Sequence, residues 1–185
     1  MKKSIADLRV NYSKNKLSES SVYKDPFKQF EKWWKQAIKA VVYEVNAMTL
    51  ATASADGLPA ARIVLLKGFD EKGFTFFSNY SSFKGKQLLE NPRACLVFFW
   101  KELERQVRIT GLIQKLDDQA NDVYFSSRPE ESRIGAIASP QSKVIKSREW
   151  LDEQFKKKKK ELKGKQINRP DNWGGYLVKP VIIEF

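Results

Sequence analysis

The chain has 185 residues, of which 42% are hydrophobic, and this length predicts one domain with a hydrophobic core of its own. It contains no histidine and a single cysteine, Cys95, which excludes an intramolecular disulfide, a zinc site of the usual Cys/His kind and most nucleophilic triads. No run reaches the roughly 20 apolar residues of a membrane span, and no signal-peptide core follows the first residues. We therefore expect a soluble, cytoplasmic protein, with Cys95 buried and inert inside the apolar run 94–100.

The formal net charge of +12 indicates an anionic partner, and two explanations stay open. One is nucleic acid, favoured by five tryptophans and the run Lys156–Lys160. The other is a phosphorylated cofactor and substrate, with the lysines on a solvated helix over 147–165. A sparse apolar stripe favours the second explanation, and its members are Trp150, Leu151, Phe155 and Leu162.

The chain begins with a polar, weakly periodic segment, residues 1–24, which predicts an arm ahead of a domain over 25–185. Asp25-Pro26 predicts the start of a helix, with an N-cap followed by proline at the first helical position. The apolar residues that follow at helical spacing are Phe27, Phe30, Trp34, Ala37, Ile38 and Val41.

From residue 48 the pattern changes to short β-type runs. We expect strands over 48–53, 61–67, 74–78, 94–100, 106–114 and 175–185. Turn signals at Asp56-Gly57 and at 70–73 predict hairpins and therefore an antiparallel sheet. Helices are expected over 82–90, 117–126 and 146–163. The prediction is a mainly β fold with flanking helices, in the form of a closed or partly closed antiparallel barrel.

An enzyme without histidine needs a cofactor, and no Gly-rich loop of the dinucleotide-binding or P-loop type is present. The segment Arg62–Lys67 offers cations on a strand, where alternate residues face opposite sides. Arg62, Val64 and Leu66 would share one face, and Ile63, Leu65 and Lys67 the other. An edge strand with two solvated cations would show the same alternation.

Three further polar residues suit a phosphorylated ligand. Ser78 ends a strand and Lys84 lies in the first turn of a short helix, where backbone N–H groups and the helix dipole favour a phosphate. Helix capping by Ser81 or Ser82 explains the same pattern. The amide of Gln106 can donate to and accept from a pyrimidine ring, although a lone glutamine on a strand is usually a surface residue.

Taken in order, four segments resemble the pyridoxamine 5′-phosphate oxidase family, and the resemblance runs from about Leu8 to Phe185. They are Arg-Ile-Val-Leu-Leu-Lys at 62–67, Ser-Asn-Tyr-Ser-Ser-Phe-Lys at 78–84, Leu-Glu-Arg-Gln-Val at 103–107 and Trp-Gly-Gly at 173–175. The resemblance implies an FMN-binding split β-barrel that forms a homodimer with flavin at the subunit interface. It also implies a vitamin B6 oxidoreductase that oxidises pyridoxamine or pyridoxine 5′-phosphate to pyridoxal 5′-phosphate. Hydride leaves C4′ of the substrate for the flavin, and O2 is reduced to H2O2.

The resemblance also implies roles for individual residues, and the redox step falls to the cofactor, so no catalytic side chain is assigned. The implied FMN contacts are Arg62, Ile63, Val64, Leu65, Leu66, Lys67, Phe77, Ser78, Lys84, Gln106, Gln141, Ser142 and Trp173. The implied substrate contacts are Lys67, a phosphate clamp of Tyr124, Arg128 and Ser132, and two arm residues, Arg9 and Tyr12. The arm residues belong to a segment, 9–12, that would cover the site.

Two departures from the family pattern affect the expected activity. Phe83 stands where the family has a basic residue, and the lost contact would weaken FMN binding by roughly 1.5–3 kcal/mol. The family continues into an Arg-Leu-His-Asp-Arg segment beyond the position of Phe185, and this segment faces the substrate. The alternative function is therefore an FMN- or pyridoxal-phosphate-binding protein of the same fold with little or no oxidase activity.

Overall fold

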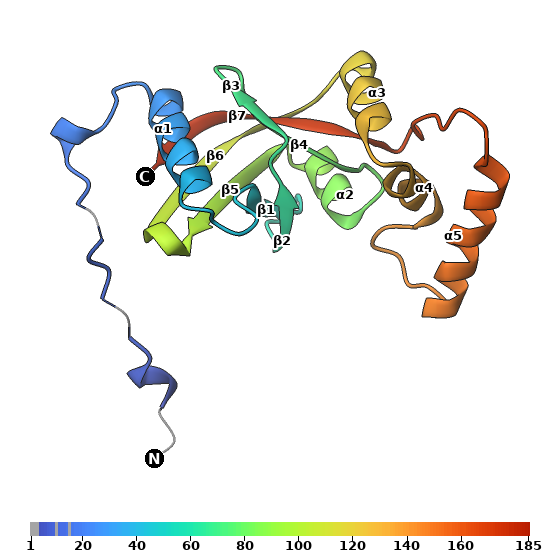
Figure 1. Ribbon diagram of the computed structural model, residues 1–185, viewed down its shortest axis with the longest axis horizontal. Coiled ribbons are helices and arrows are strands. Elements are labelled where there is room, and N and C mark those ends of the chain that lie inside the picture. Colours follow the sequence, from blue (N-terminus) through green and yellow to red (C-terminus); the bar gives the residue numbers. More distant parts are fainter. Residues whose placement is uncertain (1–3, 10, 15) are drawn as a thin grey trace.

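The computed structural model describes residues 4–9, 11–14 and 16–185, and its elements form one sheet with helices around it (Figure 1). The α-helices are α1 Pro26–Lys39, α2 Phe83–Glu90, α3 Asp118–Ser127, α4 Glu130–Ala138 and α5 Arg148–Leu162. The strands are β1 Ala47–Ala53, β2 Pro59–Leu65, β3 Gly68–Asp70, β4 Gly73–Asn79, β5 Arg93–Trp100, β6 Arg105–Lys115 and β7 Trp173–Glu184. Short 3-10 turns occupy Ile5–Asp7, Glu19–Ser21 and Lys101–Leu103.

Helix α1 starts as the sequence predicts. Asp25 is its N-cap, and the carboxylate accepts the N–H groups of Phe27 and Lys28. Phe30 and Ala37 are fully buried against the sheet, which confirms their place on the apolar face.

The far end of this face was predicted wrongly. Ile38 is 54% exposed and Val41 is 86% exposed, because the helix ends at Lys39 and Val41 has a positive φ of 53°. Trp33, which the helical spacing did not single out, is buried at 7% exposure. The buried stripe of α1 therefore keeps Phe30 and Ala37 of the prediction, includes Trp33 and ends before Ile38.

The seven strands are antiparallel and lie in the order β2-β1-β5-β6-β7-β4-β3. The two edge strands of the sheet, β2 and β3, are joined by Leu66 and Lys67 alone. The N–H of Leu66 donates to the carbonyl of Asn46 before β1, and the N–H of Lys67 donates to the carbonyl of Thr75 on β4, both at 2.8 Å. Because consecutive residues bond to opposite edges, the sheet curls round on itself, which confirms the predicted mainly β, split-barrel fold.

The barrel interior is rich in aromatic side chains, and buried residues alternate with more exposed ones along β1, β5 and most of β6. On β5, Leu96, Phe98 and Trp100 are buried, and Phe98 packs against Phe30 of α1 with ring centroids 5.2 Å apart. Cys95 lies on the opposite face of the same strand and is partly exposed, so the prediction of a buried thiol was wrong. The alternation of strand side chains is the physical reason.

A second, smaller core lies under the helices α3 to α5, which Figure 1 shows gathered on the side of the sheet away from α1. It contains Phe125, Ile134, Ile167 and Trp173. Helix α4 was not predicted, whereas α5 is close to its predicted range. The apolar stripe of α5 is half-buried, and two of its lysines, Lys158 and Lys159, pair with Glu161 and Glu131. None of the helices in the described ranges is long and apolar enough to cross a membrane.

Candidate functional site

A cleft of about 700 Å³ opens where the barrel meets the helical side of the molecule. It is walled by β2 and β4, by the first turn of α2, by the α3–α4 connection and by the start of β7. The residues that line it are Arg62, Ile63, Val64, Leu65, Lys67, Phe77, Ser78, Asn79, Lys84, Tyr124, Arg128, Pro129, Ser132, Gln141 and Trp173. Most of the residues that the sequence analysis selected therefore share one cavity.

Lys84 is a buried cation, with 9% of its surface exposed. Its ammonium donates to Oε1 of Gln141 at 2.9 Å, and the same oxygen accepts from the hydroxyl of Ser78 at 3.4 Å. Burial lowers the pKa of Lys84, and the nearby positive charge of Arg62 lowers it further. The folded protein therefore holds this charge at a free-energy cost.

Arg62 lies beside it, with Nη1 donating to the hydroxyl of Thr52 at 2.6 Å and to two backbone carbonyls. Burial lowers the pKa of Arg62 as well. Across residues 4–9, 11–14 and 16–185, no carboxylate oxygen lies within 4.0 Å of either cation. A buried cation beside a half-buried one, neither with a carboxylate partner among the described residues, forms a site that an anion such as a phosphate would stabilise.

The backbone brings Lys84 to this position through a close contact between α2 and β4. Ser82 caps α2 by accepting the N–H of Gly85, and a Cβ on Gly85 would lie 2.2 Å from the carbonyl oxygen of Tyr80. Only glycine allows the helix to begin this near the end of the strand. The first turn of α2 is thereby held next to Ser78.

Three aromatic rings stand nearly parallel along another wall of the cleft. Phe77 stacks on Tyr124 with centroids 3.8 Å apart and on Trp173 at 5.4 Å, with interplanar angles of 17° and 14°. The backbone after Trp173 is fixed, because the N–H of Gly175 donates to Oδ1 of Asn121 at 2.7 Å. These rings form a rigid, apolar wall against which a planar ligand would lie.

Arg128 provides a second cationic position at the end of α3. Its guanidinium lies 4.7 Å from the ring centroid of Trp173, and its Nη1 is buried without a hydrogen-bond partner among the described residues. Burial lowers the pKa of Arg128. An unpartnered buried donor is costly, so this nitrogen is suited to an acceptor that arrives with a ligand.

Five predicted site residues fall outside the cleft. Leu66 is buried in the barrel core, and Ser142, with a positive φ of 64°, is exposed beyond Gln141. Gln106 is exposed on β6 opposite Phe99, and the arm residues Arg9 and Tyr12 are exposed too. Val10 of the arm segment lies outside the described residues.

Residues that were not predicted from the sequence also support the site. Asn79 and Pro129 line the cleft, and Thr52 and Gln87 orient Arg62, since the hydroxyl of Thr52 bonds to Oε1 of Gln87 at 2.6 Å. A signal existed, because Thr52 continues the inward-facing series of Met48 and Leu50 on β1. A polar residue at such a position needs a buried partner.

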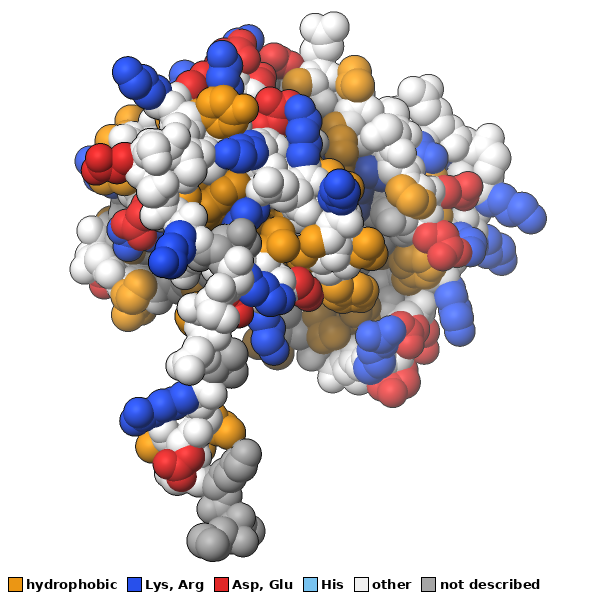
Figure 2. All heavy atoms as spheres, turned by 60° about the vertical axis from the view of Figure 1, so that its left-hand side comes forward, with side chains coloured by type: hydrophobic (Ala, Val, Ile, Leu, Met, Phe, Trp, Pro, Cys, Tyr) orange, Lys and Arg blue, Asp and Glu red, His pale blue; other side chains and the backbone are white. Residues whose placement is uncertain are grey.

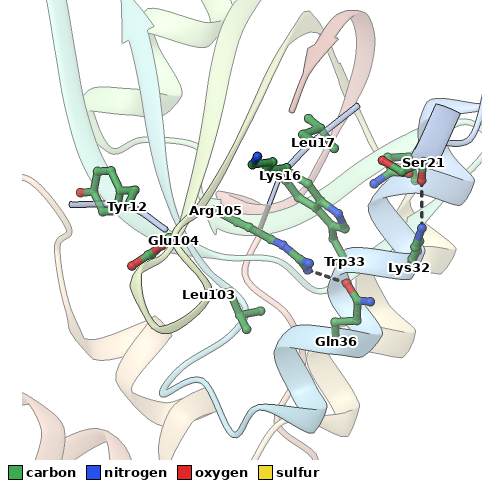
Figure 3. Close-up of a pocket in the computed structure, with 11 residues that line it drawn as sticks. Tyr12, Lys16, Leu17, Ser21, Lys32, Trp33, Gln36, Leu103, Glu104 and Arg105 are labelled. Carbon is green, nitrogen blue, oxygen red and sulfur yellow. Dashed lines mark hydrogen bonds between the residues drawn. The ribbon is translucent and has the colours of Figure 1, made fainter. Parts of the chain in front are cut away.

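Tyr12 lies at a different cavity, of about 270 Å³, between the arm, α1 and the β5–β6 turn (Figure 3). Tyr12 lines this cavity and Gln106 directly follows Arg105, another of its lining residues. The guanidinium of Arg105 lies 4.6 Å from the ring centroid of Trp33 and donates to Oε1 of Gln36 at 2.6 Å. In one chain, Gln106 and Tyr12 therefore lie apart from the predicted residues that line the cleft.

A curled seven-stranded antiparallel sheet, with flanking helices and a cation-lined cleft against β2, defines the split-barrel class of fold. The family follows from comparison. Residues 34–158 match the family model described as pyridoxamine 5′-phosphate oxidase, and the chain belongs to this family.

Relatives and solved structures agree with this assignment. The chain is 51% identical to the pyridoxine/pyridoxamine 5′-phosphate oxidase of Trichormus variabilis over 185 residues, which is 100% of this chain and 86% of the relative. It is 54% identical to the enzyme of the same name from Paraburkholderia phymatum over 181 residues, 98% of this chain and 85% of the relative.

Two solved structures have similar folds. PhzG from Burkholderia lata, in complex with tetrahydrophenazine-1-carboxylic acid, superposes with a TM-score of 0.85 at 28% identity, over 89% of this chain and 81% of that one. A pyridoxamine 5′-phosphate oxidase-related, FMN binding protein from Nostoc punctiforme gives a TM-score of 0.65 at 20% identity, over 86% and 82% of the two chains. The second likeness shows the fold alone.

Proposed function

We propose that the protein is an FMN-dependent oxidase that converts pyridoxamine or pyridoxine 5′-phosphate to pyridoxal 5′-phosphate in vitamin B6 metabolism, with O2 as acceptor and H2O2 as product. The observation that carries the proposal is the buried Lys84 beside the half-buried Arg62, two cations without a carboxylate partner among the described residues. Arg128 adds a second cationic position in the same cleft. A cofactor and a substrate that each carry one phosphate require two such positions.

The first position suits the phosphate of FMN. Lys84 and Arg62 would supply charge-assisted hydrogen bonds. The hydroxyl of Ser78 shares the acceptor Oε1 of Gln141 with Lys84, so it lies near enough to add a further hydrogen bond to the phosphate. The strand from Ile63 to Leu65 lines the cleft and would lie along the flavin. When bound, FMN supplies the hydride acceptor and the reaction with O2.

The second position suits the phosphate of the substrate. Arg128 Nη1 is an unused donor, and the hydroxyls of Tyr124 and Ser132 line the same cleft. The stacked rings of Phe77, Tyr124 and Trp173 would exclude water and limit how the substrate ring can lie. Lys67, exposed at the cleft edge, would lie near that ring.

A second copy of the chain would complete the site. Gln106 and the arm residues lie away from their own cleft, so they would reach the cleft of a partner. The strand partner of Gln106, Phe99, is 56% exposed, and Ile63 of β2 is 64% exposed. Burying such residues favours association, and we propose a homodimer with FMN between subunits. A cytoplasmic location stays a prediction.

Product formation tests this function. FMN-loaded protein is mixed in air with pyridoxine 5′-phosphate, and pyridoxal 5′-phosphate and H2O2 are measured together. We expect equal amounts of the two products, and with pyridoxamine 5′-phosphate an equal amount of ammonia as well. A rate no higher than that of free FMN would overturn the proposal and favour the alternative, a binding protein of the same fold. Phe83, 51% exposed and outside the cleft lining, is the observation that keeps this alternative open.

A further inference from the structure

The turn between β5 and β6 holds the arm through one carboxylate. Oε2 of Glu104 accepts the backbone N–H groups of Ser13 at 2.8 Å and Lys14 at 2.9 Å. The ammonium of Lys14 donates to the backbone carbonyl of Glu102 at 2.7 Å. For residues 4–9, 11–14 and 16–17, these three are the hydrogen bonds that reach the rest of the chain. Glu104 is therefore the main polar attachment of this part of the arm.

The turn that carries Glu104 is itself firmly placed. Glu104 adopts a left-handed conformation, with φ of 53° and ψ of 40°, at the end of the 3-10 turn Lys101–Leu103. The next residue, Arg105, stacks on Trp33 and bonds to Gln36, and so joins the turn to α1 (Figure 3). Gln106 follows directly on β6. The turn and Gln106 are thus joined to α1, and Ser13 and Lys14 of the arm are bonded to the same turn.

Ahead of this attachment, the arm points away from its own body. Figures 1 and 2 show residues 4–9 at the far end of a segment that projects from the rounded part of the molecule. Its apolar side chains are uncovered, with Ile5 87%, Leu8 68% and Tyr12 69% exposed. A segment with such side chains gains free energy when another surface covers it.

We infer that Glu104 is a positioning residue: its hold on Ser13 and Lys14 sets how the arm residues Arg9 and Tyr12 reach the cleft of a second copy, where the proposed function has them cover the bound substrate as a strap. This inference rests on the proposed function, which supplies the substrate and the second copy. The fastening at Ser13 and Lys14 limits how far Arg9 and Tyr12 can reach. Without the hydrogen bonds to Glu104, the arm is held less firmly, and ordering it over the bound substrate costs more conformational entropy.

The test compares Glu104→Ala with Glu102→Ala in the FMN-loaded protein. Glu102 is a matched control, because it is an exposed carboxylate in the same turn whose backbone, not its side chain, contacts the arm. We expect trypsin to cleave Glu104→Ala after Arg9 or Lys14 about tenfold faster than wild type, because the arm opens more often. The KM for pyridoxine 5′-phosphate should rise about fivefold, with kcat and FMN affinity retained. Glu104→Gln keeps an uncharged acceptor, so its rate of arm cleavage and its KM should lie between those of wild type and Glu104→Ala.

The outcomes separate this inference from the function on which it rests. A wild type that makes no pyridoxal 5′-phosphate contradicts the proposed function. An active wild type whose Glu104→Ala variant matches Glu102→Ala in arm cleavage, or in KM, overturns the role of Glu104 alone. Should turnover be absent, protection of the arm from trypsin by pyridoxal 5′-phosphate in wild type but not in Glu104→Ala supports the strap, and equal protection overturns it.

Discussion

Lys84 shows how a single residue can oppose folding and favour binding. Its ammonium is buried beside the like charge of Arg62, so both groups lose hydration without gaining a carboxylate from the described chain. Such an arrangement persists in proteins where a ligand returns the lost interaction. The residue should therefore have opposite effects on the free energy of unfolding and on the affinity for FMN.

Replacing Lys84 with methionine tests this opposition. We expect the cofactor-free variant to be as stable as wild type or more so, because a desolvated charge is replaced by an apolar chain of similar length. FMN affinity should fall roughly 10- to 100-fold, as expected for the loss of a charge-assisted bond. Urea unfolding of the apoprotein and fluorescence titration with FMN measure the two effects. Parallel losses in both would show that Lys84 has a purely structural role.

The depressed pKa of Lys84 also predicts a pH dependence. The folded protein releases this proton at a lower pH than the unfolded chain, whose lysine has the ordinary value of 10.5. Between the two pKa values the unfolded state binds more protons, so the stability of the apoprotein should rise with pH in that window. FMN affinity should fall over the same window, because the phosphate loses a cation. Titrations between neutral pH and about pH 10 check both trends, and both should be weaker in Lys84→Met.

At the scale of elements, much of the fold could be predicted, because its signals are local. The start of α1 follows from Asp25-Pro26, and all six predicted strand ranges agree with the observed ones to within two residues. Strand β3, Gly68–Asp70, is too short for any alternation to show. Helix α4 was missed because Pro129 precedes it without a side-chain cap bond and its apolar stripe is weak.

The candidate site could be predicted only in part, for a reason of topology. The segment from Arg62 to Leu65 was selected correctly, but all four residues line the cleft, whereas alternation placed them on two opposite faces. The distance between Gln106 and the cleft depends on the order of the strands in the sheet and on the end of β6 at which Gln106 lies. The spacing of residues along the sequence gives no information on either. The support of Arg62 by Thr52 and Gln87 is equally nonlocal.

Two helical glycines give matched predictions at this scale. Gly85→Ala should destabilise the protein by at least about 2 kcal/mol, because its Cβ would overlap the carbonyl of Tyr80 and push α2 from β4. FMN affinity should fall with it, since Lys84 moves too. Gly135→Ala in α4 meets only a side-chain carbon of Phe155 at 3.9 Å and should stabilise by about 0.5–1 kcal/mol. Chemical unfolding of both variants checks the contrast, and equal stabilities would refute the close-contact argument.

At the scale of the whole molecule, the proposed homodimer predicts that each site draws residues from two copies of the chain. Phe99→Glu should separate the dimer, because Phe99 is 56% exposed beside Gln106 and a buried carboxylate at an interface is costly. FMN affinity should fall roughly tenfold or more as half of each site is removed. Val123→Glu, at an exposed residue of α3, is the control and should change neither property. Sedimentation with FMN titration measures both, and a monomeric Phe99→Glu that binds FMN like wild type would contradict the shared site.

The most direct test of the proposed function is to observe the bound cofactor itself. The protein is loaded with FMN, freed of excess, and mixed without oxygen with pyridoxine 5′-phosphate while the visible absorption is recorded. The account predicts bleaching within the mixing experiment and full recovery of the flavin spectrum when air is admitted, with pyridoxal 5′-phosphate in the solution. A flavin that stays bound and coloured in the presence of saturating substrate would contradict the oxidase function.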